Sequence, residues 1–413
     1  MSLRFSRNFL RRAGIVLLSL ILLAGVIYSF ALPTHHRFPD EQEYLYLSDH
    51  LLHGPGYSMD GVHLTAMRPP GYPFFLSAVE ACGGGVVAMR LLQYLLFIAT
   101  VVLVYRLLCL ENHRAGLLVV TCVVMLYPVL FYTSATLYPQ TLAAFLFLLA
   151  LVFLLTSPRE LPMNLVTGLT FGVLILVVPT FLFTLFVVVT VAWLLKMIEC
   201  RHGLIIFIAA SFMIGLWTAR NFAEFHQFVP VASNSGANFL IGNCENTIPD
   251  GGSGNVDRTH YEQEARALGL DEFQEDRYYR QAAVNWIKAN PGHAIALYFE
   301  KVANFFNVRN EYAPENKAEL SFWKQAVMAL SYGLLLGLLL WRLLEMRRFP
   351  LSRNEKFLLA IYILSAFTSA IFFTRIRLRL PYDYLIIAII AMHLSRRLHL
   401  WLEPAPSHQK VGA

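Results

Sequence analysis

Two adjacent carboxylates follow the first long apolar run of the chain and are the first candidates for chemistry. Asp40 and Glu41 come directly after Pro39, and Glu43 lies three residues beyond Asp40. That spacing is typical of a capping box with Asp40 as the N-cap of a helix. Such a cap leaves Glu41 without a structural role. The pair therefore predicts a helix start and, in addition, a general base.

Arginines form the second group of candidates. Arg375, Arg377 and Arg379 alternate with apolar residues just before Pro381. In an extended loop, side chains two residues apart point the same way, and the planar guanidinium group suits phosphate. The alternative is that the three side chains reach ordinary lipid head groups at the membrane surface. We favour a specific site for a lipid phosphate.

Three further arginines are predicted on the same side of a membrane as Asp40. Arg220 ends an apolar run beside Trp217, where a role as interface anchor is an equal alternative. Arg68 precedes two prolines, which force an extended backbone. Arg90 lies slightly inside an apolar run, where a charge is a functional candidate by default.

The composition indicates a membrane protein. Of 413 residues, 57% are hydrophobic and only 15% are charged, and the mean hydropathy is +0.53. Long apolar runs recur, each near the ~20 residues that span a bilayer as a helix. We expect an all-α polytopic protein. The net charge of +6 requires no nucleic acid, because much of the excess lies in short loops, where basic residues set membrane topology.

The apolar runs predict about ten membrane helices. The first follows a basic stretch, and we expect it to be retained rather than cleaved as a signal peptide. The predicted spans are 13–32, 86–110, 115–132, 137–156, 161–178, 180–197, 204–219, 322–344, 357–374 and 381–398.

The distribution of basic residues orients these helices. With a cytoplasmic amino terminus, the inner loops receive most of the lysines and arginines that flank the spans. The predicted regions are 1–32 (basic terminus and first helix), 33–85 (external, with the acidic motif), 86–220 (helices two to seven), 221–321 (large external segment), 322–400 (last three helices) and 401–413 (cytoplasmic tail).

Both external segments are expected to be ordered. Helical patterns are predicted at 40–53, 72–81, 262–268, 276–289 and 294–306, and we expect 72–81 and 294–306 to lie along the membrane surface. The Gly/Asn-rich stretch 234–238 is expected to be a loop.

Histidines and cysteines give weaker signals. His35, His36, His50, His53 and His63 share the first external segment without the spacing of a metal site. We expect no metal and no other cofactor, with a divalent ion kept as an alternative. Cys82 and Cys244 are the cysteines predicted outside. A disulfide between them is possible on this topology, and we favour two free thiols.

The ordered series of motifs resembles the GT-C glycosyltransferases of the protein O-mannosyltransferase and lipid A aminoarabinose transferase superfamily (glycosyltransferase family 39-like). The resemblance covers most of the chain and is carried by Asp40-Glu41 with Tyr44, Arg68-Pro69-Pro70, Arg90-Leu91-Leu92-Gln93, the stretch 217–221, Gly242-Asn243, 279–291 and 377–381. The chain departs from the family at Gln140, where a glutamate is common, and at Val178, where an arginine often precedes the proline.

The resemblance implies a GT-C-like enzyme that moves a sugar, with inversion, from a polyprenyl-phosphate donor at the external membrane face. Asp40 would be the general base, and Glu41 would orient the acceptor or replace Asp40. The arginines at 68, 90, 220, 375, 377 and 379 would bind the lipid phosphate. The sugar or the acceptor would contact Tyr44, Gln140, Asn238 and Asn243. The acceptor could be a lipid, a glycan or a protein. A bacterial inner membrane with a periplasmic active site is implied.

Three alternatives remain open. A lipid or solute transporter would show inverted repeats and charges near the midplane, whereas here the ionisable residues are predicted at the membrane faces. A protein that binds polyprenyl phosphate without catalysis, or that scaffolds a complex, fits the departures at Gln140 and Val178. A ligase for polyprenyl-diphosphate glycans would need the same arginines.

Overall fold

The computed structural model describes residues 7–34, 38–113, 116–252, 254–309, 312 and 322–402. Within these ranges every named element is a helix. The β contact that they contain is an isolated bridge between Ser58 and Leu64. The predicted all-α class is therefore confirmed for the part of the chain that the structure describes.

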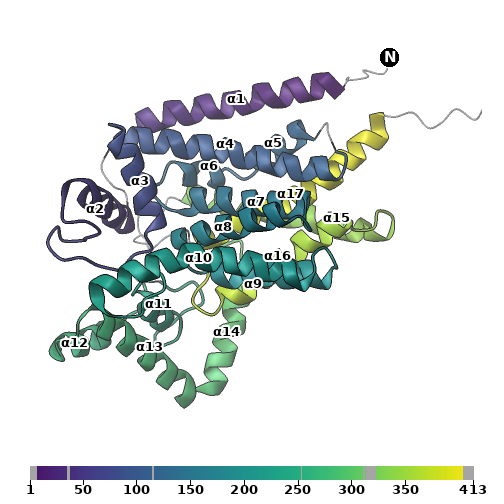
Figure 1. The fold of residues 1–413 in the computed structure, drawn as a ribbon. Helices are drawn as coiled ribbons and strands as arrows, with labels where there is room; N and C mark the ends of the chain where they lie inside the picture. The colour runs from purple at the N-terminus through teal and green to yellow at the C-terminus, as the bar shows by residue number, and fades with distance from the viewer. Residues whose placement is uncertain are drawn as a thin grey trace, which may run out of the picture.

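Five helices are long and apolar enough to cross a membrane. They are α1 (Arg7–Ala31), α4 (Val86–Leu110), α10 (Cys200–Phe225), α15 (Phe322–Leu344) and α17 (Ile376–Leu402). Shorter helices pack between them: α5 (Leu117–Met125), α6 (Val129–Ser134), α7 (Gln140–Thr156), α8 (Leu161–Val177), α9 (Phe181–Leu194) and α16 (Arg353–Ser369), with a 3-10 turn η1 (Glu345–Arg347) after α15. Figure 1 shows them as one bundle.

Each of the ten predicted spans corresponds to helix, but one of them is broken. The run 115–132 forms α5 and α6, with Pro128 between them. Proline lacks a backbone N–H and disfavours helical geometry at the preceding residue. The break between α5 and α6 therefore falls directly before Val129, at the proline.

The last helix, α17, is the centre of the bundle. Its apolar window is 89% buried, whereas the windows of the other four long helices are 22% to 39% buried. It packs against α4, α5, α7, α15 and α16 (Figure 1). The prediction of an extended loop before Pro381 is wrong, because α17 begins at Ile376. Pro381 lies inside the helix, where it removes the one backbone hydrogen bond that its N–H would donate to the carbonyl of Arg377.

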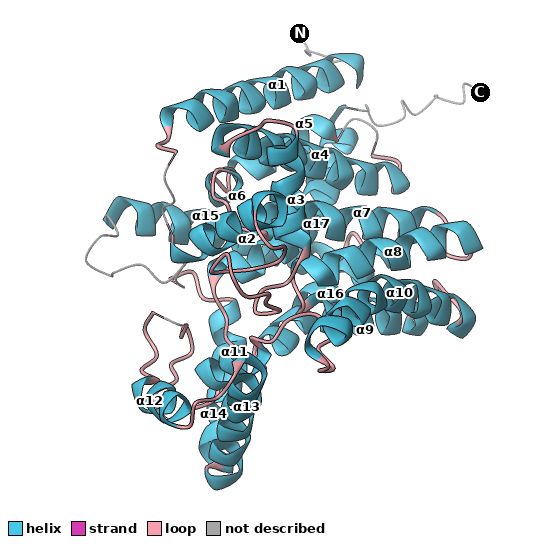
Figure 2. Ribbon diagram, turned by 60° about the vertical axis from the view of Figure 1, so that its left-hand side comes forward, coloured by secondary structure: helices cyan, strands magenta, loops and turns pink. Residues whose placement is uncertain are grey.

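The other six helices belong to the two segments that the sequence predicts to be external. They are α2 (Pro39–His53), α3 (Gly71–Ala81), α11 (Ser235–Gly242), α12 (Thr259–Ala267), α13 (Glu272–Ala289) and α14 (Pro291–Phe305). Five were predicted near these bounds. Figures 1 and 2 both show α12, α13 and α14 projecting from one side of the bundle. All five cysteines are free, including Cys82 and Cys244.

The prediction of a loop at 234–238 is wrong, because these residues open α11. The helix packs against α13, and the carboxylate of Asp276 on α13 accepts a hydrogen bond from the N–H of Gly236. A Cβ at Gly236 would overlap the backbone oxygen of Asp276. The tertiary contact thus overrides the low helix propensity of glycine and asparagine.

We predict that Gly236→Ala destabilises the protein by about 1–3 kcal/mol, the usual cost of forcing extra volume into a packed contact. Thermal unfolding of purified protein measures the loss. Gly215→Ala is the matched control, because Gly215 is also helical and a Cβ there meets nothing within 4 Å. Equal unfolding temperatures for the two variants would contradict the tight contact between α11 and α13.

Candidate active site

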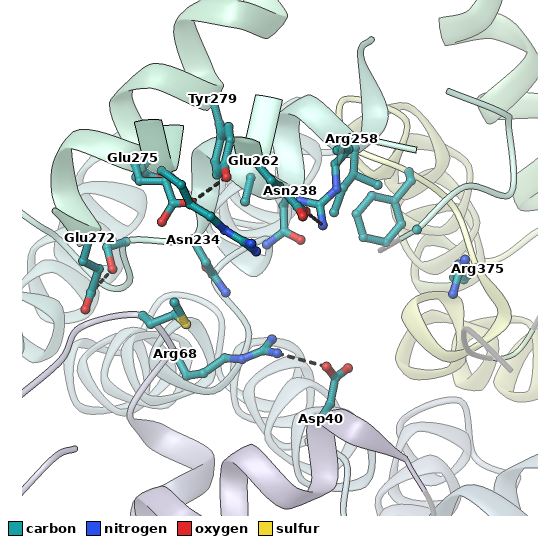
Figure 3. Close-up of a pocket in the computed structure, with 18 of the residues that line it drawn as sticks. Asp40, Arg68, Asn234, Asn238, Arg258, Glu262, Glu272, Glu275, Tyr279 and Arg375 are labelled. Atoms are coloured by element: carbon teal, nitrogen blue, oxygen red, sulfur yellow. Dashed lines mark hydrogen bonds and ion pairs between the residues drawn. The ribbon is translucent and has the colours of Figure 1, made fainter. Parts of the chain in front are cut away.

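A cavity of about 370 Å³ lies between the start of α2, the start of α17 and the helices α11 to α13. Figure 3 shows Asp40 and Arg68 on one side of it, Glu275 and Tyr279 on the opposite side, and Arg375 to the right. The side chains and glycine that line it are Asp40, Met67, Arg68, Ser233, Asn234, Ala237, Asn238, Ile241, Gly252, Arg258, Glu262, Arg266, Glu272, Glu275, Asp276, Tyr279, Phe373, Arg375 and Arg377.

Asp40 is held between two guanidinium groups. Its Oδ1 lies 2.9 Å from Nη2 of Arg68, and its Oδ2 lies 2.8 Å from Nη1 of Arg377. Burial alone would raise the pKa of Asp40, but the charges and hydrogen bonds of Arg377 and Arg68 outweigh it and lower the pKa to about 2. Asp40 is therefore ionised at neutral pH, and it joins α2 to the start of the central helix.

Arg68 has a second carboxylate partner, Glu43, one turn further along α2. Its guanidinium group also lies 5.7 Å from the centre of the Tyr44 ring. Tyr44 is buried and packs edge-on against Tyr72, with ring centroids 5.1 Å apart. Tyr44 thus lies beneath Arg68 and does not line the cavity.

Glu41 caps α2, and the prediction that Asp40 is the N-cap with Glu43 as its partner is wrong. The N-cap is Phe38, and Glu41 occupies the third helical position. The Oε2 atom of Glu41 accepts a hydrogen bond from the Phe38 N–H (3.3 Å), and its Oε1 accepts one from the Leu137 N–H (2.8 Å). The helix starts earlier than expected because Pro39 suits the first helical position and Phe38 is anchored in the core, 5.4 Å from the Tyr138 ring.

The arginines of the stretch 375–379 point in different directions. Arg377 and Arg379 are part of α17, where each residue is rotated by ~100° from the last, so they project to nearly opposite sides. Arg377 reaches Asp40, and its guanidinium group lies 4.5 Å from the centre of the Tyr138 ring. The expectation that all three side chains share one direction is wrong.

Arg375 lines the cavity and is held mainly by neutral oxygens. Its Nε donates to the carbonyls of Asp250 and Gly251, each at 3.2 Å, and its Nη2 donates to Oδ1 of Asn255 at 3.0 Å. Gly252 allows this approach, because a Cβ there would overlap the guanidinium group of Arg375.

Helix α14 holds the segment that precedes Arg375. The Nζ of Lys301 donates to the carbonyls of Gly242 (2.8 Å) and Phe372 (3.0 Å), and Asn304 donates to the carbonyl of Thr374 (3.0 Å). Burial lowers the pKa of Lys301 to about 8. These bonds fix the backbone from which Arg375 reaches the cavity.

Arg379 belongs to a buried network inside the bundle. It donates to the carbonyl of Phe305 (2.7 Å) and pairs with Asp383 (3.2 Å). Its guanidinium group also lies 3.4 Å from the centre of the Tyr332 ring, and it is 1% exposed. In this arrangement Arg379 does not line the cavity.

Five other predicted site residues also lie outside the lining. Arg220 donates to the carbonyl of Thr65 (3.1 Å) and lies 4.8 Å from the Trp217 ring, which is the anchor arrangement weighed above. Asn243 ends α11 and donates to the carbonyl of Ile371 (3.0 Å). Arg90 and Gln140 are buried in α4 and at the start of α7, and Glu41 caps α2. Of the predicted residues, the cavity brings together Asp40, Arg68, Asn238, Arg375 and Arg377.

Sequence reasoning missed the wall that α12 and α13 supply. On α13, Glu272, Glu275, Asp276 and Tyr279 have the i, i+3, i+4, i+7 spacing of one helix face, a signal that could have marked a polar site. The cavity thereby contains five carboxylates and five arginines: Asp40, Glu262, Glu272, Glu275 and Asp276, with Arg68, Arg258, Arg266, Arg375 and Arg377. Its formal charges balance.

Glu272 ties the two external segments together. Its carboxylate accepts hydrogen bonds from the hydroxyl of Thr65 (2.6 Å), from the N–H of Ala66 (3.0 Å) and from the hydroxyl of Ser233. Burial raises the pKa of Asp276, against the opposing effects of the Gly236 N–H and Arg280. The outer wall of the cavity is thus bonded to the segment that carries Arg68.

The histidines of the first external segment lie away from the cavity lining. Side-chain atoms of Asp49, His53 and Glu80 lie within 4.8 Å of one another, which is close enough for a shared metal, but no other observation in the described residues points to a ligand there. His50 and His63 bond to Ser58 and Asp60, and His35 and His36 lie outside the described residues.

Comparisons with known proteins give a distant likeness. No protein-family model and no curated protein matches the chain. Among solved structures, ArnT from Cupriavidus metallidurans in the apo state is 11% identical over 92% of this chain and 77% of its own, with a TM-score of 0.41. ArnT bound to undecaprenyl phosphate is 12% identical over 93% of this chain and 78% of its own, with a TM-score of 0.40. Both likenesses are distant, and the function proposed below rests on the residues of the cavity.

We predict that Glu41→Gln destabilises the protein by about 1–3 kcal/mol, because the amide nitrogen would face one of the two backbone N–H groups that the carboxylate now satisfies. Thermal unfolding measures the effect. Glu43→Gln is the control, since Glu43 is more exposed and Arg68 keeps its bond to Asp40. A larger loss of stability for Glu43→Gln would contradict the cap assigned to Glu41.

Proposed function

We propose that the chain is a membrane glycosyltransferase that takes a sugar from a polyprenyl-phosphate donor at the external face. The observation that carries this proposal is Asp40, held by Arg68 and Arg377 in a cavity at the start of the central membrane helix. A carboxylate beside two guanidinium groups supplies a base and a phosphate site within one cavity. The start of a helix that is long enough to cross a membrane would lie near the membrane surface, where a lipid phosphate also lies.

Three arginines of the cavity are suited to the donor phosphate. Arg375 lines the cavity, and the carbonyls of Asp250 and Gly251 and the side chain of Asn255 position its guanidinium group. Arg377 and Arg68 each keep donor groups beyond those that hold Asp40. Together they would stabilise the negative charge that grows on the phosphate as the sugar leaves. The positive end of the α17 dipole lies at the same place.

Asp40 is the proposed general base. As long as both arginines hold it, Asp40 is a weak base, because its pKa of about 2 is far from neutral. A donor phosphate competes with Asp40 for Arg377, which frees Oδ2 and raises its basicity. Asp40 then takes the proton of the acceptor hydroxyl, the acceptor oxygen bonds to the anomeric carbon from the opposite face, and polyprenyl phosphate leaves with the bonding electrons.

Beside its charged residues, the lining contains neutral partners for the sugar. Asn234, Asn238 and Tyr279 point into the cavity from α11 and α13 (Figure 3). Glu41 has no direct part in this mechanism, since both of its oxygens bond to the backbone. We place the cavity on the periplasmic side of a bacterial inner membrane with the amino terminus in the cytoplasm. Basic residues at the opposite helix ends, such as Arg201, Arg347 and Arg353, support this orientation.

A second candidate function is binding of polyprenyl phosphate without transfer. The observation that favours it is the same pair of ion bonds, which leaves Asp40 weakly basic in the absence of substrate. Transfer of a labelled sugar from polyprenyl phosphate, set against binding of the same lipid, separates the two functions. Binding with no transfer to any acceptor in a membrane extract would establish the second.

We predict that Asp40→Asn lowers sugar transfer by about 10²- to 10⁴-fold, the usual contribution of a general base. Labelled polyprenyl-phosphate sugar and purified protein measure the rate, and thermal unfolding checks the fold. Wild-type turnover in folded Asp40→Asn would show that the base assignment is wrong.

Arg377→Gln should raise the pKa of Asp40, because it removes one of the two charges that lower it. The acidic limb of the pH profile of kcat/KM should therefore move to higher pH.

We predict that Arg375→Ala weakens binding of polyprenyl phosphate by about 10- to 100-fold, since a hydrogen bond to a charged group contributes about 1.5–3 kcal/mol. Arg379→Ala is the matched comparison. It should lower stability by about 3–5 kcal/mol, because it leaves Asp383 buried without its charge partner. Stronger loss of binding in Arg379→Ala, with intact stability, would instead favour Arg379 as the phosphate ligand.

A further inference from the structure

A second cavity, of about 470 Å³, lies between α12 and α13 in the external part of the molecule. Its volume is within the usual range of ligand pockets, about 300–1,000 Å³. The mechanism proposed above does not use it. It is lined by Tyr261, Glu264, Tyr278, Gln281, Ala282, Asn285, Trp286, Ala289 and Asn290.

The two cavities share helices α12 and α13, and each cavity is lined by different residues of these helices. Helix α13 presents Glu275 and Tyr279 to the first cavity, and Tyr278 and Trp286 to the second. The rings of Tyr278 and Tyr279 are neighbours, with centroids 5.7 Å apart. Helices α12 and α13 therefore form the wall between the two cavities. A long molecule could occupy the second cavity while its end reaches the first.

The residues of α13 that line the second cavity carry no charge. They recur at i, i+3, i+4, i+7, i+8 and i+11 from Tyr278, as one helix face requires, and they are aromatic, amide or alanine. The charged residues of α13 are not part of this lining: Glu272, Glu275, Asp276, Arg277, Arg280 and Lys288. The one charge in the lining is Glu264 of α12. A binding face that excludes charge in this way is matched to a neutral ligand.

Hydrogen bonds orient the polar groups of this lining and leave capacity for a ligand. The Tyr278 hydroxyl donates to Glu264 (2.6 Å), and Nε2 of Gln281 donates to Oδ1 of Asn285 (2.8 Å). The Gln281 carbonyl oxygen and the Asn285 amide N–H groups remain available. Within the described residues, the indole N–H of Trp286 also has no hydrogen-bond partner. Oriented donors and acceptors thus surround aromatic surface.

We propose that this cavity binds a neutral saccharide that forms part of the acceptor. A sugar ring exposes C–H groups on its faces, which pack on aromatic rings such as Trp286, and hydroxyls at its rim, which bond to amides such as Gln281 and Asn285. The acceptor is then a glycan or a glycolipid whose sugar chain crosses α13 toward Asp40. This inference rests on the proposed function.

A membrane contact fits the lining less well. A helix that lies on a membrane carries Trp, Phe or Leu on one face and lysine or arginine on the other. The lining of the second cavity contains no lysine or arginine, and it mixes its aromatic rings with the amides of Gln281, Asn285 and Asn290. The neighbouring helix α14 does expose aliphatic and aromatic surface at Ile295 and Phe299, which are 60% and 57% exposed. The membrane-facing role thus belongs to α14, and the lining of the second cavity belongs to a polar, uncharged ligand.

Binding of fluorescently labelled neutral hexasaccharides of glucose, mannose and N-acetylglucosamine to the full chain in lipid nanodiscs tests the proposal. We expect at least one to bind, with a Kd raised at least tenfold by Trp286→Ala and about two- to fivefold by Asn285→Ala. Lys288→Ala, which changes an exposed residue of α13 outside the lining, should leave the Kd unchanged. Binding of polyprenyl phosphate should be the same in all four proteins.

Two results would overturn the proposal. One is that no hexasaccharide binds the wild type more tightly than it binds Trp286→Ala. The other is that brominated lipids quench the tryptophan fluorescence of Trp286, which is the part of the emission that Trp286→Phe removes. Such quenching would place this face in the membrane. Saccharide binding without sugar transfer would contradict the proposed function but not the saccharide site. Sugar transfer at the same rate in wild type and Trp286→Ala would contradict the saccharide site but not the proposed function.

Discussion

The ion pairs of Asp40 are the interaction on which the candidate site depends. They connect three parts of the chain that are far apart in sequence: the start of α2, the extended segment at Arg68 and the start of α17. In a partly buried site, each charge would be costly without the others. The arrangement therefore fixes where the first external segment meets the bundle, and it holds two guanidinium groups at the edge of the cavity.

The central helix explains why this end of the cavity is rigid. Two residues beyond Arg377, Arg379 is bonded to Asp383, and Asp383 accepts hydrogen bonds from the hydroxyls of Tyr127 (2.9 Å) and Tyr362 (3.2 Å). Charges buried among membrane helices must be paired and hydrogen-bonded to persist. The network therefore fixes the rotation of α17 about its axis, and that rotation decides which arginine faces Asp40.

The sequence predicted the elements of the fold better than the contacts of the site. Apolar runs located the helices, and the bounds of α4 and α15 were predicted correctly, because an uninterrupted span has a clear length. The prediction of the site was wrong where a side chain bonds to a residue that is remote in sequence. Glu41 bonds to Leu137, Arg379 to Phe305 and Asn243 to Ile371, and no local pattern encodes these pairings.

Asp40, Arg68 and Arg377 could be predicted because each breaks a local rule: a carboxylate or an arginine stands where membrane topology does not call for one. Arg258 and Arg266 could not, because charged residues on exposed helices are ordinary and have no unusual spacing. The extent of α17 was missed for a different reason. A proline that follows three arginines resembles a loop, and only packing in the bundle shows that the helix continues through it.

The triple hydrogen bond at Glu272 has a consequence for the route by which substrates enter. Because Glu272 bonds to Thr65, Ala66 and Ser233, the outer wall cannot swing away from the segment that carries Arg68 without leaving a carboxylate unsatisfied. The cavity is therefore held shut on that side. A lipid-linked donor of the proposed reaction would therefore have to enter the cavity on another side.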